Sequence, residues 1–245
     1  MNPSTAAERL AFLTRAREAF ASEHGYRAQQ SVYQGSLGPD ARVVLREELT
    51  ALPPCDALEV GCGEGELASW LTERGHRTVA LDVSPRMARL ASTKGVSTLV
   101  AALPDLPFPN DSFDCVVGAW VLHYLPSALI DASLRELARV ARPGAFLCLT
   151  TNANRHMEEL WSRVPRVRYR LSFPAEEAAR LLDGVAHQVR VTEVEGTVTF
   201  ESLEQAREFI RPQVAPPSIA DALEPFEPPL EVTRRAAVIT GRFRP

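Results

Sequence analysis

Three glycines and one acid form the clearest chemical pattern in this sequence. Gly61, Gly63 and Gly65 follow the short apolar run at residues 57–60, and Asp82 closes the next apolar run. Glycine tolerates positive φ and has no Cβ, so a ligand can lie directly against the main chain where a strand passes into a helix. A carboxylate at the end of the following strand can accept hydrogen bonds from a ribose. The pattern therefore predicts a turn that binds a nucleoside.

The charge of this turn distinguishes among nucleoside ligands. A dinucleotide site has the spacing GxGxxG and binds pyrophosphate at the helix N-terminus. Here the last glycine comes one residue early, Glu66 takes its place, and Glu59 and Glu64 flank the turn. Like charges about 4 Å apart repel by roughly 4 kcal/mol at an effective dielectric constant near 20, so a pyrophosphate is disfavoured. S-adenosylmethionine, which has a ribose, a sulfonium, an ammonium and no phosphate, suits these acids.

Three stretches of the chain resemble one enzyme family. Residues 59–65 (EVGCGEG) resemble the first motif of the class I methyltransferases, which is commonly an acid, one residue and then GxGxG. Residues 106–125 (LPFPNDSFDCVVGAWVLHYL) are similar to the family pattern in which LPF, a turn with an acid and SFD precede the fourth strand. Residues 142–145 (RPGA) resemble the family's turn into the fifth strand. The resemblance covers roughly residues 58–151 and implies a Rossmann-like methyltransferase of the bacterial small-molecule type.

Alternating strands and helices must position these motifs. Apolar runs predict strands at 57–60, 79–81, 96–101, 113–118 and 146–150, with amphipathic helices between them. Right-handed connections then give a parallel, doubly wound α/β sheet whose ligand crevice lies at the carboxyl ends of the strands. The resemblance further implies a mostly parallel seven-stranded sheet whose last strand, at about residues 235–243, runs antiparallel to its neighbours.

The resemblance also implies the cofactor, S-adenosyl-L-methionine, whose product is S-adenosyl-L-homocysteine. The residues expected to bind it follow the first four strands: Glu59, Gly61, Cys62, Gly63, Asp82, Val83, Met87, Ala102, Leu103, Ala119 and Trp120. One position departs from the family pattern, because the family usually has an acid after the third strand that binds the adenine amino group, and the aligned residue here is Ala102. The adenine would then bind backbone groups near Leu103, or Asp105.

Two histidines lie at the predicted ligand edge, His123 after the fourth strand and His156 after the fifth. Methyl transfer is an in-line displacement that depends mainly on positioning, and a base helps only an acceptor that must lose a proton. Each histidine is a candidate base or substrate-orienting residue, or an imidazole that only binds the backbone or the cofactor. Residues 151–160 (TNANRHMEEL) are similar to a segment of bacterial small-molecule enzymes, which favours His156 as the substrate-facing residue. We expect Tyr124 in the core.

The chain of 245 residues has the length of one α/β domain with additions. We expect N-terminal helices at residues 1–52, as a lid over the cofactor or as cover for the sheet edge. Residues 53–245 would form the core, with substrate-contacting insertions at about 152–185 and 201–230. The proline-rich segment 211–229 would be a lid or an irregular connection.

Composition and charge disfavour several classes of ligand and location. The net charge of −4 comes without any basic run, so nothing favours a nucleic-acid groove. Four cysteines without CxxC spacing indicate buried, reduced thiols: Cys55, Cys62, Cys115 and Cys148. The scattered histidines predict no metal site. The charged residues 1–21 and the lack of a long apolar run predict neither a signal peptide nor a membrane anchor, and thus a cytoplasmic protein.

These observations predict a cytoplasmic S-adenosylmethionine-dependent methyltransferase that methylates O, N or C of a small organic acceptor, with natural-product metabolism as one setting. We expect a monomer or homodimer. An RNA-base methyltransferase is a second interpretation, which the acidic pI near 5.8 disfavours. A third is a non-catalytic S-adenosylmethionine-binding protein, and a fourth is a nicotinamide oxidoreductase stabilised by NAD.

Overall fold

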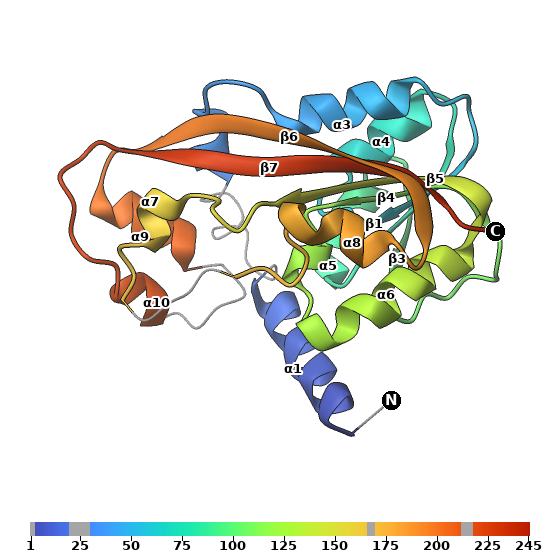
Figure 1. The fold of residues 1–245 in the computed structure, drawn as a ribbon, viewed down its shortest axis with the longest axis horizontal. Coiled ribbons are helices and arrows are strands. Elements are labelled where there is room, and N and C mark those ends of the chain that lie inside the picture. The colour runs from blue at the N-terminus through green and yellow to red at the C-terminus, as the bar shows by residue number, and fades with distance from the viewer. Residues whose placement is uncertain (1–2, 20–29, 166–169, 212–217) are drawn as a thin grey trace.

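The computed structural model describes residues 3–19, 30–165, 170–211 and 218–245, and within them a seven-stranded sheet forms the centre (Figure 1). The strands follow the order β3-β2-β1-β4-β5-β7-β6. Their bounds are β1 Asp56–Val60, β2 Arg77–Asp82, β3 Ser97–Val100, β4 Phe113–Ala119, β5 Ala141–Asn152, β6 Ala186–Phe200 and β7 Leu230–Phe243. β1 to β5 are parallel, and β7 is antiparallel to both β5 and β6. The predicted mostly parallel sheet with an antiparallel last strand is confirmed.

Helices cover both faces of the sheet because successive strand residues point to opposite sides. In β4, Cys115 and Val117 pack with α3 and α4, whereas Val116 packs with α6 and α8. Figure 1 shows α3 and α4 above the sheet and α6, α8 and α1 below it. The bounds are α1 Pro3–Ala19, α3 Ala41–Thr50, α4 Glu66–Glu73, α5 Pro85–Ser92, α6 Ser127–Val140 and α8 Ala178–Leu182. None of the described helices combines the length and apolar composition that a bilayer-spanning segment needs.

The β6–β7 hairpin extends beyond the rest of the sheet and carries a second apolar core. Figure 1 shows the shorter helices α7 (Glu158–Trp161), α9 (Leu203–Ile210) and α10 (Ser218–Asp221) beneath its far end. We call this core the hairpin cluster: Val32, Met157, Leu160, Trp161, Val164, Val198, Phe200, Ala206, Phe209, Ile210, Ala220, Leu223 and Val232. Phe200 and Phe209 meet edge to face, with ring centres 5.4 Å apart. The predicted segments 152–185 and 201–230 thus contribute to one packed unit.

The predicted turn at residues 142–145 is built inside β5. Phe113 pairs with Ala141, and regular pairing resumes at Cys115 and Phe146, so the intervening residues form a bulge. Gly144 has φ +77°, which suits glycine. The strand therefore begins earlier than the apolar run predicts.

Parts of three predicted segments lie outside the described residues. The N-terminal segment 1–52 includes residues 1–2 and 20–29, the insertion at about 152–185 includes residues 166–169, and the insertion at about 201–230 includes residues 212–217. The described part of the proline-rich segment 211–229 includes α10, and its Ala220 and Leu223 are buried in the hairpin cluster.

Candidate active site

A cavity of about 350 Å³ lies at the carboxyl ends of β1, β2, β3 and β4, within the usual range for small-molecule sites. The first four strands deliver their following loops to one edge, which is why segments far apart in sequence meet here. All eleven residues predicted to contact a cofactor line this cavity: Glu59, Gly61, Cys62, Gly63, Asp82, Val83, Met87, Ala102, Leu103, Ala119 and Trp120. Their contact with a cofactor stays a prediction.

The turn after β1 requires glycine for two reasons. Gly61, Gly63 and Gly65 all have positive φ, between +53° and +79°. A Cβ on Gly61 would lie 2.3 Å from Cγ2 of Val121, and a Cβ on Gly65 would lie 2.8 Å from Cα of Ala91. The turn therefore brings bare main chain to the cavity and lets α5 pack closely behind it.

Asp82 holds this turn while facing the cavity. Its Oδ2 accepts a hydrogen bond from the Gly63 N–H at 3.0 Å, and its Oδ1 accepts one from the Ser84 N–H at 2.8 Å. Burial raises the pKa of the carboxyl, while these backbone hydrogen bonds lower it. The backbone of Val83 also hydrogen-bonds this carboxyl. Because a carboxylate offers about four acceptor positions, Asp82 retains capacity to accept a hydrogen bond from a ligand hydroxyl without releasing the turn.

Glu59 is a buried acid with one oxygen unpaired. Its side chain is only 3% exposed, and it accepts a hydrogen bond from the backbone of Ala68 in the first turn of α4. Within the described residues, Oε2 of Glu59 has no hydrogen-bond partner. Burial, together with nearby Asp82, raises the pKa of Glu59 to about 8. A buried carboxyl with an unpaired oxygen is suited to a cationic ligand group.

Apolar side chains of α1 form another part of the cavity wall. Phe12 and Ala16 of this helix line the cavity, and Arg17 Nε donates to the carbonyl of Val83 at 3.3 Å. The expectation that Asp105 could reach a bound adenine finds no support in the described contacts. Asp105 pairs instead with Arg9 of α1, and its side chain is 66% exposed.

Trp120 stands in a strained conformation at the end of β4. Its φ is +54°, a region that side chains other than glycine seldom adopt. The Trp120 N–H donates to the Thr150 carbonyl, and the indole Nε1 donates to Oδ1 of Asn152 at 2.9 Å. Tyr124, expected in the core, packs against the core and also lines the cavity. Two aromatic side chains therefore form part of the wall beside β4.

His123 is held in one tautomer. Its Nδ1 lies 3.2 Å from Oγ1 of Thr151, and the Thr151 hydroxyl donates to the Phe173 carbonyl at 2.6 Å. Because that hydroxyl proton is engaged, Oγ1 must accept a proton from Nδ1, which leaves the lone pair of His123 on Nε2. Burial, with the nearby His156, lowers the pKa of His123 to about 3. The imidazole is therefore a neutral acceptor.

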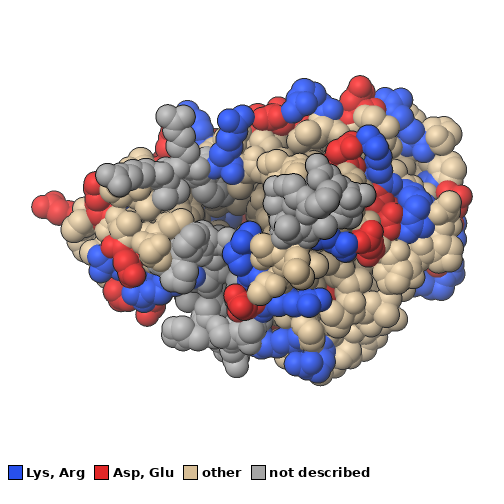
Figure 2. Space-filling model, turned by 90° about the horizontal axis from the view of Figure 1, so that it is seen from below, with Lys and Arg blue, Asp and Glu red and all other residues tan. Residues whose placement is uncertain are grey.

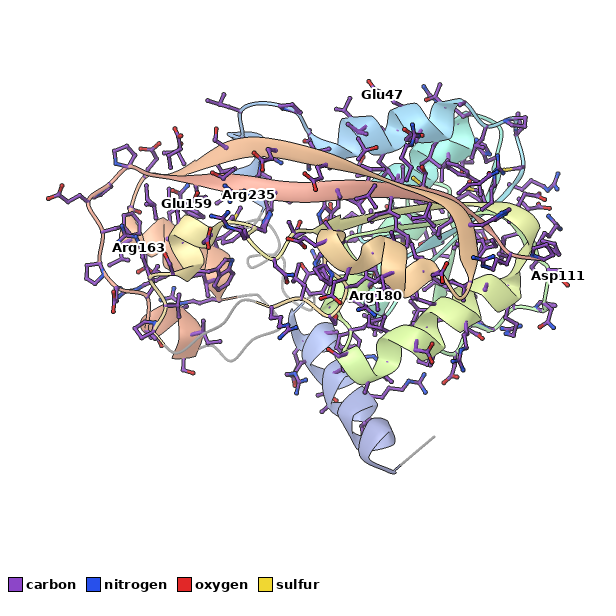
Figure 3. The ribbon with its side chains drawn as sticks, viewed as in Figure 1. Glu47, Asp111, Glu159, Arg163, Arg180 and Arg235 are labelled. Atoms are coloured by element: carbon purple, nitrogen blue, oxygen red, sulfur yellow. The ribbon has the colours of Figure 1, made fainter. Side chains whose placement is uncertain are left out.

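His156 faces β7 rather than the cavity. Its Nδ1 lies 3.0 Å from the Arg235 carbonyl oxygen and 3.2 Å from the Arg235 nitrogen, so either tautomer binds the backbone of β7. Burial lowers the pKa of His156 to about 4. Figure 3 shows Arg235 on β7 beside Glu159 of α7, the region to which His156 is tied. Of the described residues, those lining the cavity include neither histidine.

The sequence predicts N-terminal helices over the cofactor or over the sheet edge, but it does not identify the residues of α1 and α3 that line the cavity. Phe12 and Ala16 come from α1, and Arg42, Leu45 and Arg46 come from α3. The spacing of three and four residues on each helix marks a shared face, but that signal does not say what the face meets. Among the described residues, no group of three or more potential ligands is arranged to hold a metal ion.

Comparison with known proteins agrees with this geometry. A family model described as a methyltransferase domain matches residues 58–149. Malonyl-[acyl-carrier protein] O-methyltransferase of Salmonella typhimurium is 30% identical over 167 residues, 66% of this chain and 66% of that protein. Fatty-acid O-methyltransferase of Mycolicibacterium smegmatis is 35% identical over 112 residues, 43% of this chain and 40% of that protein. The chain thus matches just under two thirds of the first relative and less of the second.

Solved structures share the fold. A methyltransferase from Aquifex aeolicus superposes with a TM-score of 0.53 at 20% identity, covering 83% of this chain and 89% of that one. The 1,6-didemethyltoxoflavin-N1-methyltransferase of Burkholderia thailandensis, solved with S-adenosylhomocysteine, gives a TM-score of 0.51 at 19% identity, covering 84% and 77%. The sheet order, the glycine turn with its two acids, the matching domain model and these relatives lead to one conclusion: the chain belongs to the class I S-adenosylmethionine-dependent methyltransferase family.

Proposed function

We propose that this protein transfers a methyl group from S-adenosylmethionine to O, N or C of a small organic acceptor. One observation carries the proposal: a single cavity joins the unpaired Oε2 of Glu59, the positive-φ glycine turn and the buried carboxyl of Asp82. These groups suit a ligand that has an ammonium, a sulfonium and a ribose. A pyrophosphate would meet carboxylates instead.

Different residues of the cavity would bind different parts of the donor. Asp82 would accept hydrogen bonds from the ribose, and Glu59 would face the ammonium. Val83, Met87 and Leu103 would enclose the adenine, whose polar edge would bind backbone groups near Leu103. When bound, the donor supplies a methyl group activated on a positively charged sulfur, and the protein's task is to align an acceptor with it.

The acceptor side would be built from the residues after β4 and β5. Trp120 and Tyr124 would form its wall. His123 would orient a hydroxyl or amine through the lone pair on Nε2. With a pKa of about 3 it stays neutral near pH 7, so it orients a proton donor better than it removes a proton. His156 would stabilise this side indirectly, because its hydrogen bonding to the backbone of Arg235 fixes the segment that follows β5.

The names of the relatives favour a small acceptor group. The acceptors in those names are a malonyl group on acyl-carrier protein, a fatty acid and 2-heptyl-1-hydroxyquinolin-4(1H)-one. In the view of Figure 2 acidic and basic side chains are interspersed across the face, and the chain as a whole carries a net charge of −4. Both features favour a small molecule over RNA as the acceptor.

We infer that residues 1–52 act as a lid and that the insertions at about 152–185 and 201–230 contact the acceptor. The lid is supported by the packing of Phe12 and Ala16 at the cavity. A cytoplasmic location and a monomeric or homodimeric state remain predictions.

Calorimetry tests the donor site first. The protein should bind S-adenosylmethionine and S-adenosylhomocysteine and should not bind NAD. Methyl transfer would then be assayed with malonyl thioesters, fatty acids and hydroxyquinolones. Donor binding without turnover on any acceptor would favour a non-catalytic binding protein, and binding of NAD alone would overturn the proposal. Salt-dependent RNA binding with methylation of a base would favour an RNA-base methyltransferase.

A further inference from the structure

Trp120 lies on a side of the sheet that the alternation of β4 would not give it. Successive residues of a strand point to opposite faces, yet Ala119 and Trp120 both pack against the core shared with α3 and α4. Val121 packs against the opposite core. The change of side coincides with the positive φ of Trp120, +54°. Such a strained conformation persists only where the surrounding structure fixes it.

Two hydrogen bonds fix the orientation of the indole. The Trp120 N–H donates to the Thr150 carbonyl, and the indole Nε1 donates to Oδ1 of Asn152, each at 2.9 Å. Asn152 is the last residue of β5, and it is only 8% exposed. A tryptophan has two hydrogen-bond donors, its backbone N–H and its indole N–H, so both are in use. The ring therefore presents carbon surface, rather than a donor, to the cavity that it lines.

The turn that follows β4 touches the glycine turn that follows β1. A Cβ on Gly61 would lie 2.3 Å from Cγ2 of Val121, so Val121 occupies the space that glycine leaves. Trp120 directly precedes Val121, and all three residues line the cavity. The sulfonium joins the ribose of the donor to its methionyl group. With the ribose at Asp82, it would lie beside the glycine turn and therefore beside Trp120.

Trp120 differs from three other aromatic residues in what lies over its ring. Arginines lie over Trp70, Phe146 and Phe226, between 4.1 and 5.8 Å from the ring centres. In the described part of the chain, no arginine or lysine takes this place at Trp120. The face of an aromatic ring attracts a cation through its quadrupole. The ring of Trp120 is thus available to a cationic group of a ligand.

We propose that Asn152 is a positioning residue, which holds the ring of Trp120 against the sulfonium and thereby makes the cavity prefer the charged donor over its product. This inference rests on the proposed function. S-adenosylmethionine and S-adenosylhomocysteine share the adenine, the ribose and the amino-acid group, and they differ in the methyl group and in the charge on sulfur. The ring face attracts the sulfonium but not the neutral thioether. The pair of residues would therefore favour release of the product after transfer.

Calorimetry with these two ligands isolates the charge on sulfur. Asn152→Leu, which removes the acceptor of the indole N–H, should bind S-adenosylmethionine about 3- to 10-fold less tightly. Its affinity for S-adenosylhomocysteine should stay within about twofold of the wild type. Trp120→Phe keeps a ring but lacks the N–H, so it should lose a similar factor and reports on the same hydrogen bond if Asn152→Leu does not fold. The double variant should lose no more than either single variant, because the hydrogen bond is already absent.

Thr151→Val is the matched control. It also removes a buried hydrogen bond at the end of β5, to the Phe173 carbonyl, but it leaves the contact between Trp120 and Asn152 in place. Its ratio of affinities for the two ligands should equal that of the wild type.

Four results would each overturn the role of Asn152. They are equal losses for both ligands in Asn152→Leu, an unchanged ratio of affinities in that variant, additive losses in the double variant, and the same loss in Thr151→Val. Binding of neither ligand by the wild-type protein would instead contradict the proposed function. Thermal unfolding without ligand checks that each variant is folded.

Discussion

The donor cavity and the hairpin side of the molecule use their buried polar groups in opposite ways. At the cavity, Glu59 keeps an unpaired oxygen, and Asp82 keeps acceptor capacity beyond its backbone hydrogen bonds. Beside the hairpin, Thr151 is engaged by Phe173 and His123, and His156 by Arg235. The first region retains polar groups for a ligand, whereas the second uses them to fix the chain. If the cavity binds the donor as proposed, this contrast predicts that substitutions of Glu59 or Asp82 change ligand affinity, whereas substitutions of Thr151 or His156 mainly change stability.

The largest effect is expected from added volume at the turn. Gly65→Ala combines a positive φ of +79° with a Cβ only 2.8 Å from Cα of Ala91. The conformation costs about 1–2 kcal/mol and the overlap about 1–3 kcal/mol more, and the affinity for S-adenosylhomocysteine should fall as well. Gly95→Ala is the control, with φ +78° and nothing within 4 Å of the new Cβ, so it bears only the conformational cost. Denaturant unfolding that gives equal losses for the two variants would contradict close packing at this turn.

The pH dependence of stability should have opposite signs in the two regions. The folded-state pKa of Glu59 is about 8 against an ordinary 4.5, so its contribution is present below pH 4.5 and is lost as pH rises toward 8. The pKa of His156 is about 4 against 6.5, so its contribution is present above pH 6.5 and is lost as pH falls toward 4. Each group changes the unfolding free energy by at most about 1.4 kcal/mol per pH unit.

Unfolding curves between pH 5 and pH 8 test both signs. Relative to the wild type, Glu59→Gln should gain stability as pH rises, and His156→Gln should gain stability as pH falls, because each variant lacks the titration of the replaced group. Parallel curves for the wild type and a variant would show that the replaced group does not titrate as its environment predicts.

The role of Asp82 predicts a selective loss of ligand affinity. Asp82→Ala should weaken binding of S-adenosylhomocysteine by about 1–3 kcal/mol, because charge-assisted hydrogen bonds to the ribose are lost. Adenine as a probe, which lacks the ribose, should bind the variant and the wild type alike. An unchanged calorimetric affinity for S-adenosylhomocysteine would count against a ribose at this carboxylate.

The smallest effect on stability is expected from a substitution on the proposed acceptor side. Thr151→Val leaves the Phe173 carbonyl and the His123 Nδ1–H without their partner, which should lower the unfolding free energy by about 1–2 kcal/mol. Affinity for S-adenosylhomocysteine should stay at the wild-type level. Thr151→Ser keeps the hydroxyl and should restore the stability. A variant that loses donor affinity as well would show that the donor cavity and the hairpin side are coupled rather than independent.

Local patterns correctly placed the eleven predicted residues at one cavity. The glycine spacing, Glu59 and Asp82 lie within a single strand, turn, helix and strand, so their neighbourhood follows from short-range geometry. The eleven predicted contacts could be placed at one edge because the strands are parallel and their carboxyl ends must share that edge. The prediction was less complete for Tyr124 and for residues 142–145, because packing at a strand end and a bulge depend on partner strands.

The amino-acid sequence by itself determined the glycine turn, the acids around it and the alternation of strands and helices, since each depends on residues close together in the chain. Only the tertiary structure decided that Arg46 and Phe12 reach the cavity, that His123 carries its lone pair on Nε2, and that His156 faces β7. Helical spacing identifies a buried face without naming its partner, and a tautomer depends on hydrogen bonds to residues far away in the chain. Those partners exist only once the chain has folded.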